Sequence, residues 1–231
     1  MNYVIILAGG IGSRMNMGSF PKQYLMYENR PIISYCLRTF QANKETDKII
    51  IVANEEWRKF ILTWVENDGI DKFIEFAEPG ETRQYSIING LHIVSKYADS
   101  NDIVMVHDAA RPLVPDELIT ECYRNIKGHD GVMPALPAKD TFYLSDNGKK
   151  IENLIPRNKL FAGQAPEVFY FGKYLKANEE MPENELLKIN GSTEIAFKAG
   201  LDVAIINGSE KNIKITTQND LELMKMYMEE K

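Results

Sequence analysis

A glycine-rich stretch near the N-terminus is followed by two cationic side chains, a combination typical of phosphate-binding loops. The stretch Leu7-Ala8-Gly9-Gly10-Ile11-Gly12-Ser13-Arg14 ends a short apolar run, and Pro21-Lys22-Gln23 comes soon after it. Glycines allow a sharp turn in which backbone N–H groups approach an anion. Arg14 and Lys22 add two positive charges beside that turn. The pattern therefore predicts a cradle for the phosphates of a nucleoside triphosphate.

The spacing of the glycines separates this loop from two better-known nucleotide-binding patterns. It is not the Gly-x-x-x-x-Gly-Lys-Ser/Thr of a P-loop. It also departs from the dinucleotide pattern Gly-x-Gly-x-x-Gly, because Met15 stands where the third glycine would follow Gly10 and Gly12. The full string is similar to the start of nucleotidyltransferases, which join a nucleoside triphosphate to a phosphorylated small molecule and release pyrophosphate.

A second polar cluster, His107-Asp108-Ala109-Ala110-Arg111-Pro112, follows an apolar run. A carboxylate just past a strand end, facing a phosphate site, is placed to hold a divalent cation that bridges phosphates. The alternative is that Asp108 caps the following helix and pairs with Arg111. The glycine-rich loop earlier in the chain favours the metal interpretation.

Strand and helix patterns alternate along the first half of the chain. Apolar runs at 3–7, 48–53, 73–76 and 102–107 predict buried strands. Amphipathic stretches at 31–41, 55–66 and 85–96 predict the helices between them. This order predicts a doubly wound, mostly parallel, Rossmann-like α/β sheet. Ligands of such sheets bind beyond the carboxyl ends of the strands, where both polar clusters are predicted to lie.

The segment 137–161 breaks this rhythm. Residues 141–144 and 149–154 flank Ser145-Asp146-Asn147-Gly148, which predicts a β-hairpin with an Asn-Gly turn. Such a hairpin is either a dimerisation arm or an ordinary surface hairpin, and the pattern alone does not separate the two.

The C-terminal part continues the α/β pattern. We expect a helix at 195–199 ended by Gly200, strands at 203–206 and 212–216, and a terminal helix at 220–230. No linker or repeat interrupts the chain, so we expect a single domain over residues 1–231 that carries 137–161 as an arm.

Composition excludes several function classes. The chain has 231 residues, of which 44% are hydrophobic and 26% charged, as in an ordinary soluble protein. A net charge of −6 without a basic tail argues against a nucleic-acid partner. No apolar run approaches the ~20 residues that span a bilayer, so no membrane association is expected. The isolated Cys36 and Cys122 are expected to be buried free thiols, which is consistent with the cytoplasm.

Taken in order, the motifs resemble the cytidylyltransferases that act on polyol phosphates, a family with ribitol-phosphate and methylerythritol-phosphate branches. The matching motifs are Leu7-Ala8-Gly9-Gly10, Arg14, Pro21-Lys22-Gln23, Gly80-Glu81-x-Arg83, the 107–112 cluster, Asp140-Thr141, Arg157, Gly163-Gln164-x-Pro166 and Asn212-Ile213-Lys214-Ile215-Thr216. They extend over nearly the whole chain. The resemblance implies that a phosphate oxygen of the acceptor attacks the α-phosphorus of CTP and that pyrophosphate leaves.

The resemblance also implies a role for each matching residue. The implied catalytic cations are Arg14, Lys22 and Lys214. The implied nucleotide-binding residues are Leu7, Ala8, Gly9, Gly10, Gly12, Gly80, Arg83, Ser86, Ala109 and Arg111. The implied acceptor-binding residues are Asp108, Thr141, Arg157 and Thr193, and Asp108 is also the implied ligand of Mg²⁺. Thr141 and Arg157 flank the hairpin and would reach the acceptor phosphate across a homodimer, which favours the arm interpretation.

The sequence resembles both branches of the family in the residues near the acceptor. Leu7-Ala8-Gly9-Gly10, the long stretch 16–20 and Gly163-Gln164 are similar to the ribitol-phosphate branch. The 107–112 cluster is similar to the methylerythritol-phosphate branch, whereas Ser192-Thr193-Glu194 departs from that branch. We therefore expect D-ribitol 5-phosphate as the acceptor, with 2-C-methyl-D-erythritol 4-phosphate as the alternative.

Two further function classes remain as alternatives. A catalytically silent nucleotide-binding protein is disfavoured because Arg14, Lys22, Asp108 and Lys214 are present together. A hexose-1-phosphate nucleotidyltransferase shares the opening motif, but the short chain and the 107–112 cluster disfavour it.

Overall fold

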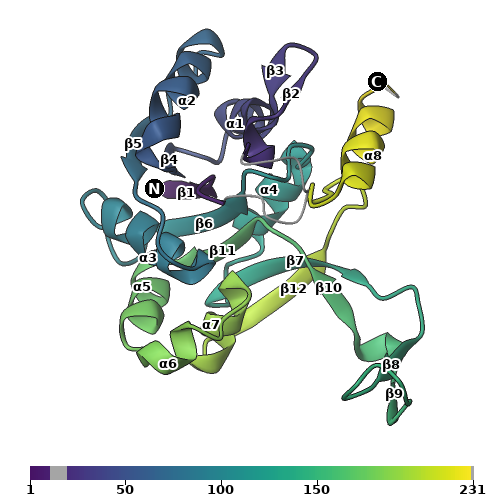
Figure 1. The fold of residues 1–231 in the computed structure, drawn as a ribbon. Helices are drawn as coiled ribbons and strands as arrows, with labels where there is room; N and C mark the ends of the chain where they lie inside the picture. The colour runs from purple at the N-terminus through teal and green to yellow at the C-terminus, as the bar shows by residue number, and fades with distance from the viewer. Residues whose placement is uncertain (11–19, 230–231) are drawn as a thin grey trace.

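The structure is a computed structural model that describes residues 1–10 and 20–229. It contains an 8-stranded mixed sheet (Figure 1). The strands are β1 (Asn2–Leu7), β4 (Lys48–Val52), β5 (Phe73–Ala77), β6 (Ile103–Asp108), β7 (Gly131–Pro137), β10 (Phe161–Gly163), β11 (Glu167–Tyr170) and β12 (Val203–Asn207). Their order across the sheet is β10-β7-β11-β6-β1-β4-β5, with β12 paired to β7.

The predicted doubly wound, mostly parallel sheet is confirmed. Parallel pairs join β1 to β4 and β6, β4 to β5, and β7 to β12. The antiparallel strand β11 lies between β6 and β7, and β10 pairs antiparallel with β7. These two antiparallel strands were absent from the sequence prediction.

Helices cover both faces of the sheet. They are α1 (Ile32–Ala42), α2 (Glu55–Asn67), α3 (Arg83–Val94), α4 (Asp116–Arg124), α5 (Phe171–Glu179), α6 (Glu183–Leu186), α7 (Ser192–Lys198) and α8 (Gln218–Glu229). The structure also contains two short 3-10 turns, η2 (Lys22–Tyr24) and η3 (Arg157–Lys159), and a small hairpin of β2 (Met26–Tyr27) and β3 (Arg30–Pro31).

The central strand β1 shows how the sheet is buried on both faces. Val4 and Ile6 belong to the core shared with α1, α2 and α4, whereas Tyr3 and Ile5 belong to the core shared with α3, α5 and α7. Alternate side chains of a strand point to opposite faces, so a strand covered by helices on both sides must be apolar throughout. This explains why the run could be recognised in the sequence.

The strand order reverses at β1. The chain passes from β1 through α1, β4, α2 and β5 in one direction, then returns through α3 to β6 on the other side of β1. Ligands of open α/β sheets bind at such a switch point, outside the carboxyl ends of the strands. Leu7 and Asp108 are partners in the β1–β6 register, so the glycine-rich loop and the 107–112 cluster leave the sheet side by side.

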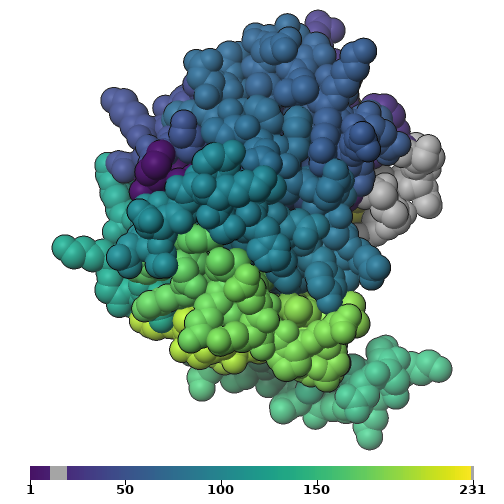
Figure 2. Space-filling model, turned by 90° about the vertical axis from the view of Figure 1, so that its left-hand side faces the viewer, coloured from purple at the N-terminus to yellow at the C-terminus, as the bar shows by residue number. Residues whose placement is uncertain are grey.

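The predicted hairpin is present, but its turn differs from the prediction. The strands β8 (Phe142–Leu144) and β9 (Asn153–Ile155) pair antiparallel and project from the sheet (Figures 1 and 2). Leu144 lies opposite Asn153, so residues 145–152 form a longer loop in place of a tight Asn-Gly turn. Gly148 adopts a φ of +69° and its N–H donates to Ser145 Oγ, which closes a separate local turn inside that loop.

The predicted strand at 212–216 is wrong. The alternating sequence suggested a strand, but within the described chain this segment joins no sheet. Its backbone is joined to the turn after β6 by a hydrogen bond in which the N–H of Ile215 donates to the carbonyl of Ala110 at 2.8 Å. Its alternating isoleucines instead pack against helices, because Ile215 is buried with Ile32 of α1 and Met224 of α8 and Ile213 packs against the same cluster.

Candidate active site

Side chains of η2 hold the loop after β1 through hydrogen bonds to its carbonyl oxygens. Gln23 Nε2 donates to the carbonyl oxygens of Ala8 at 2.6 Å and Gly10 at 2.8 Å, and the Tyr24 hydroxyl donates to Ala8 at 2.9 Å. These contacts occupy carbonyl oxygens, whereas the N–H groups of Gly9 and Gly10 have no acceptor among the described residues. Such unpaired amides at a strand end are suited to an anionic ligand.

Two glycines allow the nucleotide loops to pack closely. A Cβ on Gly9 would lie 2.5 Å from the Cβ of Pro79, and a Cβ on Gly80 would lie 2.3 Å from the Cβ of Tyr85. Ser86 Oγ accepts from the N–H of Gly80 and donates to the carbonyl of Thr82, both at 3.0 Å. The predicted nucleotide-binding loops at 8–10 and 80–86 are therefore adjacent.

Asp108 lies at the centre of a cluster of positive charges. It ends β6 and is only 7% exposed. One carboxylate oxygen lies 3.2 Å from Arg83, and the other lies 2.8 Å from Lys214 Nζ and 3.9 Å from Arg111 Nε. Burial raises the pKa of Asp108, but the charges of Arg83, Lys214 and Arg111 outweigh burial and hold that pKa well below its usual range. Asp108 is therefore an ionised carboxylate at neutral pH.

The neighbouring histidine positions this cluster. His107 is fully buried, and burial lowers its pKa to about 4, so the ring is neutral at physiological pH. Its Nε2 lies 3.1 Å from the carbonyl of Arg111, which accepts from that nitrogen. Together with the hydrogen bond from the N–H of Arg111 to the carbonyl of Asp108, this contact fixes the turn after β6.

The segment that carries Lys214 is tied to the same turn. Arg111 Nη1 donates to the carbonyl of Asn212 at 2.7 Å, and Asn212 Nδ2 donates to the carbonyl of Ala165 at 2.7 Å. These bonds and the Ile215–Ala110 hydrogen bond hold Lys214 against Asp108. The structure therefore brings together two residues that are more than 100 positions apart.

A cavity of about 540 Å³ opens beside Asp108. Among the predicted site residues, it is lined by Arg83, Asp108, Arg111, Thr193 and Lys214. The guanidinium of Arg83, which was predicted to bind nucleotide, also donates to Ser192 Oγ at 2.8 Å and lies on this side of the site. Leu7 and Ala109 do not line this cavity, and the N–H of Ala109 donates to the carbonyl of Leu7 at 3.1 Å.

Several predicted residues lie elsewhere. Thr141 and Arg157 belong to the exposed segment 137–161 and do not line this cavity; Arg157 Nη1 donates to the carbonyl of Lys139. Lys22 opens η2, directly before the Gln23 that holds the glycine-rich loop. Gly12 and Arg14 lie outside the described residues.

The sequence prediction missed Glu167. This residue begins β11, is 7% exposed and lines the same cavity as Asp108. Its Oε1 accepts from both the N–H of Thr193 at 3.1 Å and the hydroxyl of Thr193 at 2.8 Å. The only sequence signal was its position directly after the Gly163-Gln164-x-Pro166 motif.

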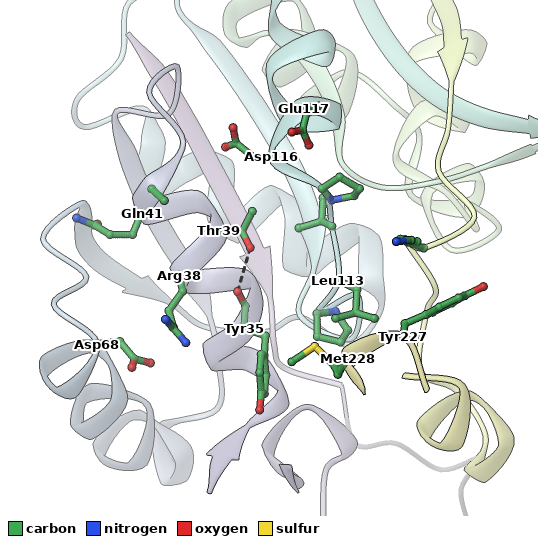
Figure 3. A pocket seen from close by; sticks show the side chains of 15 residues that line it. Tyr35, Arg38, Thr39, Gln41, Asp68, Leu113, Asp116, Glu117, Tyr227 and Met228 are labelled. Atoms are coloured by element: carbon green, nitrogen blue, oxygen red, sulfur yellow. Dashed lines mark hydrogen bonds between the residues drawn. The ribbon is translucent and has the colours of Figure 1, made fainter. Parts of the chain in front are cut away.

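A larger cavity of about 760 Å³ lies between α1, the segment 112–117 and α8 (Figure 3). Its lining includes Arg38, Leu113, Asp116, Lys211 and Met228, but none of the predicted site residues. Size alone therefore does not identify the reactive site. The smaller cavity is the candidate because it holds the ionised carboxylate and the cations at the switch point.

Within the described residues, no helix combines the length and apolar character needed to cross a membrane.

Comparisons with known proteins agree with this geometry. The family model described as 2-C-methyl-D-erythritol 4-phosphate cytidylyltransferase (IspD) matches residues 2–230. A ribitol-5-phosphate cytidylyltransferase from Vibrio parahaemolyticus serotype O3:K6 is 34% identical over 230 residues, covering 99% of this chain and 96% of the relative. A 2-C-methyl-D-erythritol 4-phosphate cytidylyltransferase from Clostridium botulinum type Ba4 is 33% identical over 228 residues, covering 99% and 97%.

A comparison with solved structures points to the same family. The crystal structure of the Francisella tularensis 2-C-methyl-D-erythritol 4-phosphate cytidylyltransferase superposes with a TM-score of 0.80 at 29% identity, covering 97% of this chain and 98% of that chain. These matches cover nearly the full length of the chain, as do the sequence motifs that meet at the switch point. The chain therefore belongs to the IspD family of cytidylyltransferases.

Proposed function

We propose that this cytidylyltransferase transfers CMP from CTP to D-ribitol 5-phosphate, forming CDP-ribitol and pyrophosphate. The observation that carries the proposal is the meeting of the glycine-rich loop with the Asp108–Lys214 pair at one edge of the sheet. The ribitol acceptor is supported by the name of the Vibrio relative. The alternative acceptor, 2-C-methyl-D-erythritol 4-phosphate, is supported by the name of the Clostridium relative.

The proposed reaction depends on placing two anions against each other. An oxygen of the acceptor phosphate attacks the α-phosphorus of CTP, and the bond from that phosphorus to the pyrophosphate oxygen breaks. Positioning and charge neutralisation supply most of the catalysis in such transfers. Lys214 is suited to this role because it lines the cavity and its side chain is 34% exposed. Lys22 and Arg14 are proposed to bind the triphosphate.

The two sides of the site are proposed to bind different substrates. The N–H groups of Gly9 and Gly10, which have no acceptor in the part of the chain that the structure describes, and the 80–86 loop are assigned to CTP. Asp108, Arg83 and Thr193 are assigned to the acceptor, because they line the cavity beside that loop. For Arg83 this assignment replaces the nucleotide-binding role implied by the sequence resemblance.

Mg²⁺ is the proposed cofactor, with Asp108 as its protein ligand. Mg²⁺ is usually bound by one or two carboxylates together with substrate phosphates and water. Asp108 fits this pattern as an ionised carboxylate next to the phosphate loop, and no cluster of three or more acidic, His or Cys ligands occurs in residues 1–10 and 20–229. When bound, the ion would neutralise charge on the triphosphate.

A homodimer is proposed, with the arm of one chain completing the site of the other. Apolar side chains on the arm are unusually exposed, including Tyr143 at 57%, Leu154 at 56% and Ile151 at 61%. Contiguous exposed apolar surface marks interaction sites. Two polar residues of the same region, Thr141 and Arg157, remain away from the cavity of their own chain. A cytoplasmic location is also proposed, supported by two buried free cysteines.

Mixed dimers test the arm. We expect Lys214→Ala and Arg157→Ala each to lower activity strongly as pure proteins, because each removes one part of every site. Co-refolding the two variants should restore activity, since one of the two sites in a mixed dimer then has both residues. Steady-state pyrophosphate release measures the recovery. Absence of recovery in verified mixed dimers would show that the arm serves its own chain.

An acceptor panel tests the proposed reaction. We expect pyrophosphate release with CTP, Mg²⁺ and D-ribitol 5-phosphate to exceed that with 2-C-methyl-D-erythritol 4-phosphate, glycerol 3-phosphate and glucose 1-phosphate. ATP, GTP and UTP in place of CTP serve as nucleotide controls. Turnover of methylerythritol phosphate without turnover of ribitol phosphate would refute the proposed acceptor and favour the alternative.

A further inference from the structure

The buried carboxylate of Glu167 has unused hydrogen-bonding capacity inside the acceptor cavity. Its Oε1 accepts the two hydrogen bonds from Thr193 described above, which occupy both lone pairs of that oxygen. Its Oε2 lies 3.7 Å from Arg83 Nη2, which is an ionic contact but too long for a hydrogen bond. Among the described residues, Oε2 therefore keeps acceptor capacity in a cavity where it is largely shielded from water.

Glu167 and Asp108 face the cavity as a pair. Arg83 Nη2 lies 3.2 Å from Asp108 Oδ1 and 3.7 Å from Glu167 Oε2, so one guanidinium nitrogen separates the two carboxylates. Strand pairing produces this arrangement, because Glu167 lies opposite Val106, two residues before Asp108. Two carboxylates held this close can accept hydrogen bonds from different hydroxyls of one short molecule.

Another part of the cavity lining is apolar. It is formed by Met133, Phe197, Leu201, Val203 and Ile205. Phe197 is 78% exposed and Ile205 is 52% exposed, so both are available to a ligand in the described chain. A cavity with carboxylates in one part and apolar side chains in another matches a polyol chain, which presents both hydroxyls and a hydrocarbon backbone.

We propose that Glu167 is a specificity-determining residue that accepts a hydrogen bond from one hydroxyl of the acceptor. This inference rests on the proposed function and adds a second carboxylate contact to that of Asp108. A site built to bind a hydroxyl discriminates strongly against an analogue that lacks it, because the buried polar group is then left unpaired. Glu167 thereby selects acceptors that carry this hydroxyl, in addition to any selection by size.

A purely structural role for Glu167 makes a different prediction. The residue also holds Thr193, in the first turn of α7, so its loss could disturb that helix. Damage to α7 would lower activity with every acceptor by a similar factor. A hydrogen bond to the substrate instead couples the Glu167 side chain to one particular hydroxyl. A double-mutant cycle detects this coupling when one change is made in the enzyme and the other is the removal of a substrate hydroxyl.

The test combines Glu167→Gln with four ribitol 5-phosphate analogues, each lacking one of the hydroxyls. The amide keeps an oxygen for Thr193 but replaces the free carboxylate oxygen with a donor. We expect kcat/KM for ribitol 5-phosphate to fall about 10- to 100-fold, the usual effect of losing a hydrogen bond to a charged group. With the parent enzyme, kcat/KM for one of the analogues should be lower than kcat/KM for ribitol 5-phosphate by a similar factor. With Glu167→Gln, kcat/KM for that analogue should be little lower than kcat/KM for ribitol 5-phosphate. The KM for CTP should be unchanged.

Glu185→Gln is the matched control. Glu185 also contacts α7, through Lys198 at 3.2 Å, but does not line the cavity. Glu167→Asp, which keeps the charge and shortens the side chain, provides a second variant, and the same coupling to one hydroxyl is expected. Equal fold losses with ribitol 5-phosphate and all four analogues in both Glu167 variants would overturn the inference while leaving the proposed function intact. A parent enzyme that fails to use ribitol 5-phosphate would overturn both.

Discussion

Lys214→Ala is expected to lower kcat by about 10²–10³-fold, the usual cost of removing one preorganised electrostatic group from a transferase site. Lys214 lines the acceptor cavity, and its ammonium lies 2.8 Å from Asp108. In the proposed reaction, negative charge passes from the acceptor phosphate to the α-phosphate, and a fixed cation stabilises that change. Asp108 keeps Arg83 as a partner in the variant, so the fold should persist.

The measurement is pyrophosphate release under saturating CTP and acceptor, with circular dichroism to verify the fold. Lys225→Ala is the control, because Lys225 lies on α8 and pairs only with Glu222 among the described residues. Its kcat should equal that of the parent. If Lys214→Ala raised KM for the acceptor and left kcat unchanged, Lys214 would bind the ground state and the transition state equally, against the proposed role.

The part of the site built on parallel strands could be predicted from the sequence. The apolar runs of β1 and β6 are buried on both faces, and parallel strands end at the same edge of a sheet. The glycine-rich loop and Asp108 therefore had to lie close together, and the register confirms that Leu7 and Asp108 are partners. The apolar pattern of the strands and the topology of the sheet both place the glycine-rich loop beside Asp108.

Glu167 shows why other parts could not be predicted. It reaches the site because the antiparallel strand β11 inserts between β6 and β7, which places Glu167 opposite Val106. A pairing between positions 61 residues apart leaves no periodic pattern in the sequence. The segment 212–216 shows the opposite error, since its alternating Ile213 and Ile215 pack against α1 and α8 and, within the described residues, form no strand ladder.

The acceptor role proposed for Arg83 differs from the nucleotide-binding role that the sequence resemblance implies. In the chain, Arg83 follows Gly80 and was grouped with that loop. In the fold, α3 begins at Arg83, and the side chain reaches Asp108 and Ser192. A long side chain at a helix start can extend away from the backbone beside it, and its contacts with Asp108 and Ser192 are the basis of the proposed acceptor role.

Asp108→Asn is expected to abolish detectable transfer and to destabilise the fold by about 3 kcal/mol at pH 7. The substitution keeps the size of the side chain but leaves Arg83, Arg111 and Lys214 clustered around a neutral amide. Removing one partner from a buried ionic cluster is costly because the remaining charges lose their compensation. Urea unfolding of parent and variant measures the difference. Asp202→Asn is the control, since Asp202 is exposed and its loss should change stability by less than about 0.5 kcal/mol.

The difference between parent and Asp108→Asn should depend on pH in a defined direction. The native pKa of Asp108 lies well below its usual range, so the unfolded chain takes up this proton at a higher pH than the native chain. The stabilisation from the ionised carboxylate is therefore complete above the unfolded pKa of about 3.9 and is lost as the pH falls below it. The stability gap should stay constant from pH 7 to pH 5 and narrow by about 1.4 kcal/mol per unit below pH 3.9. A gap that widened on acidification would show that burial, and not the surrounding cations, controls Asp108.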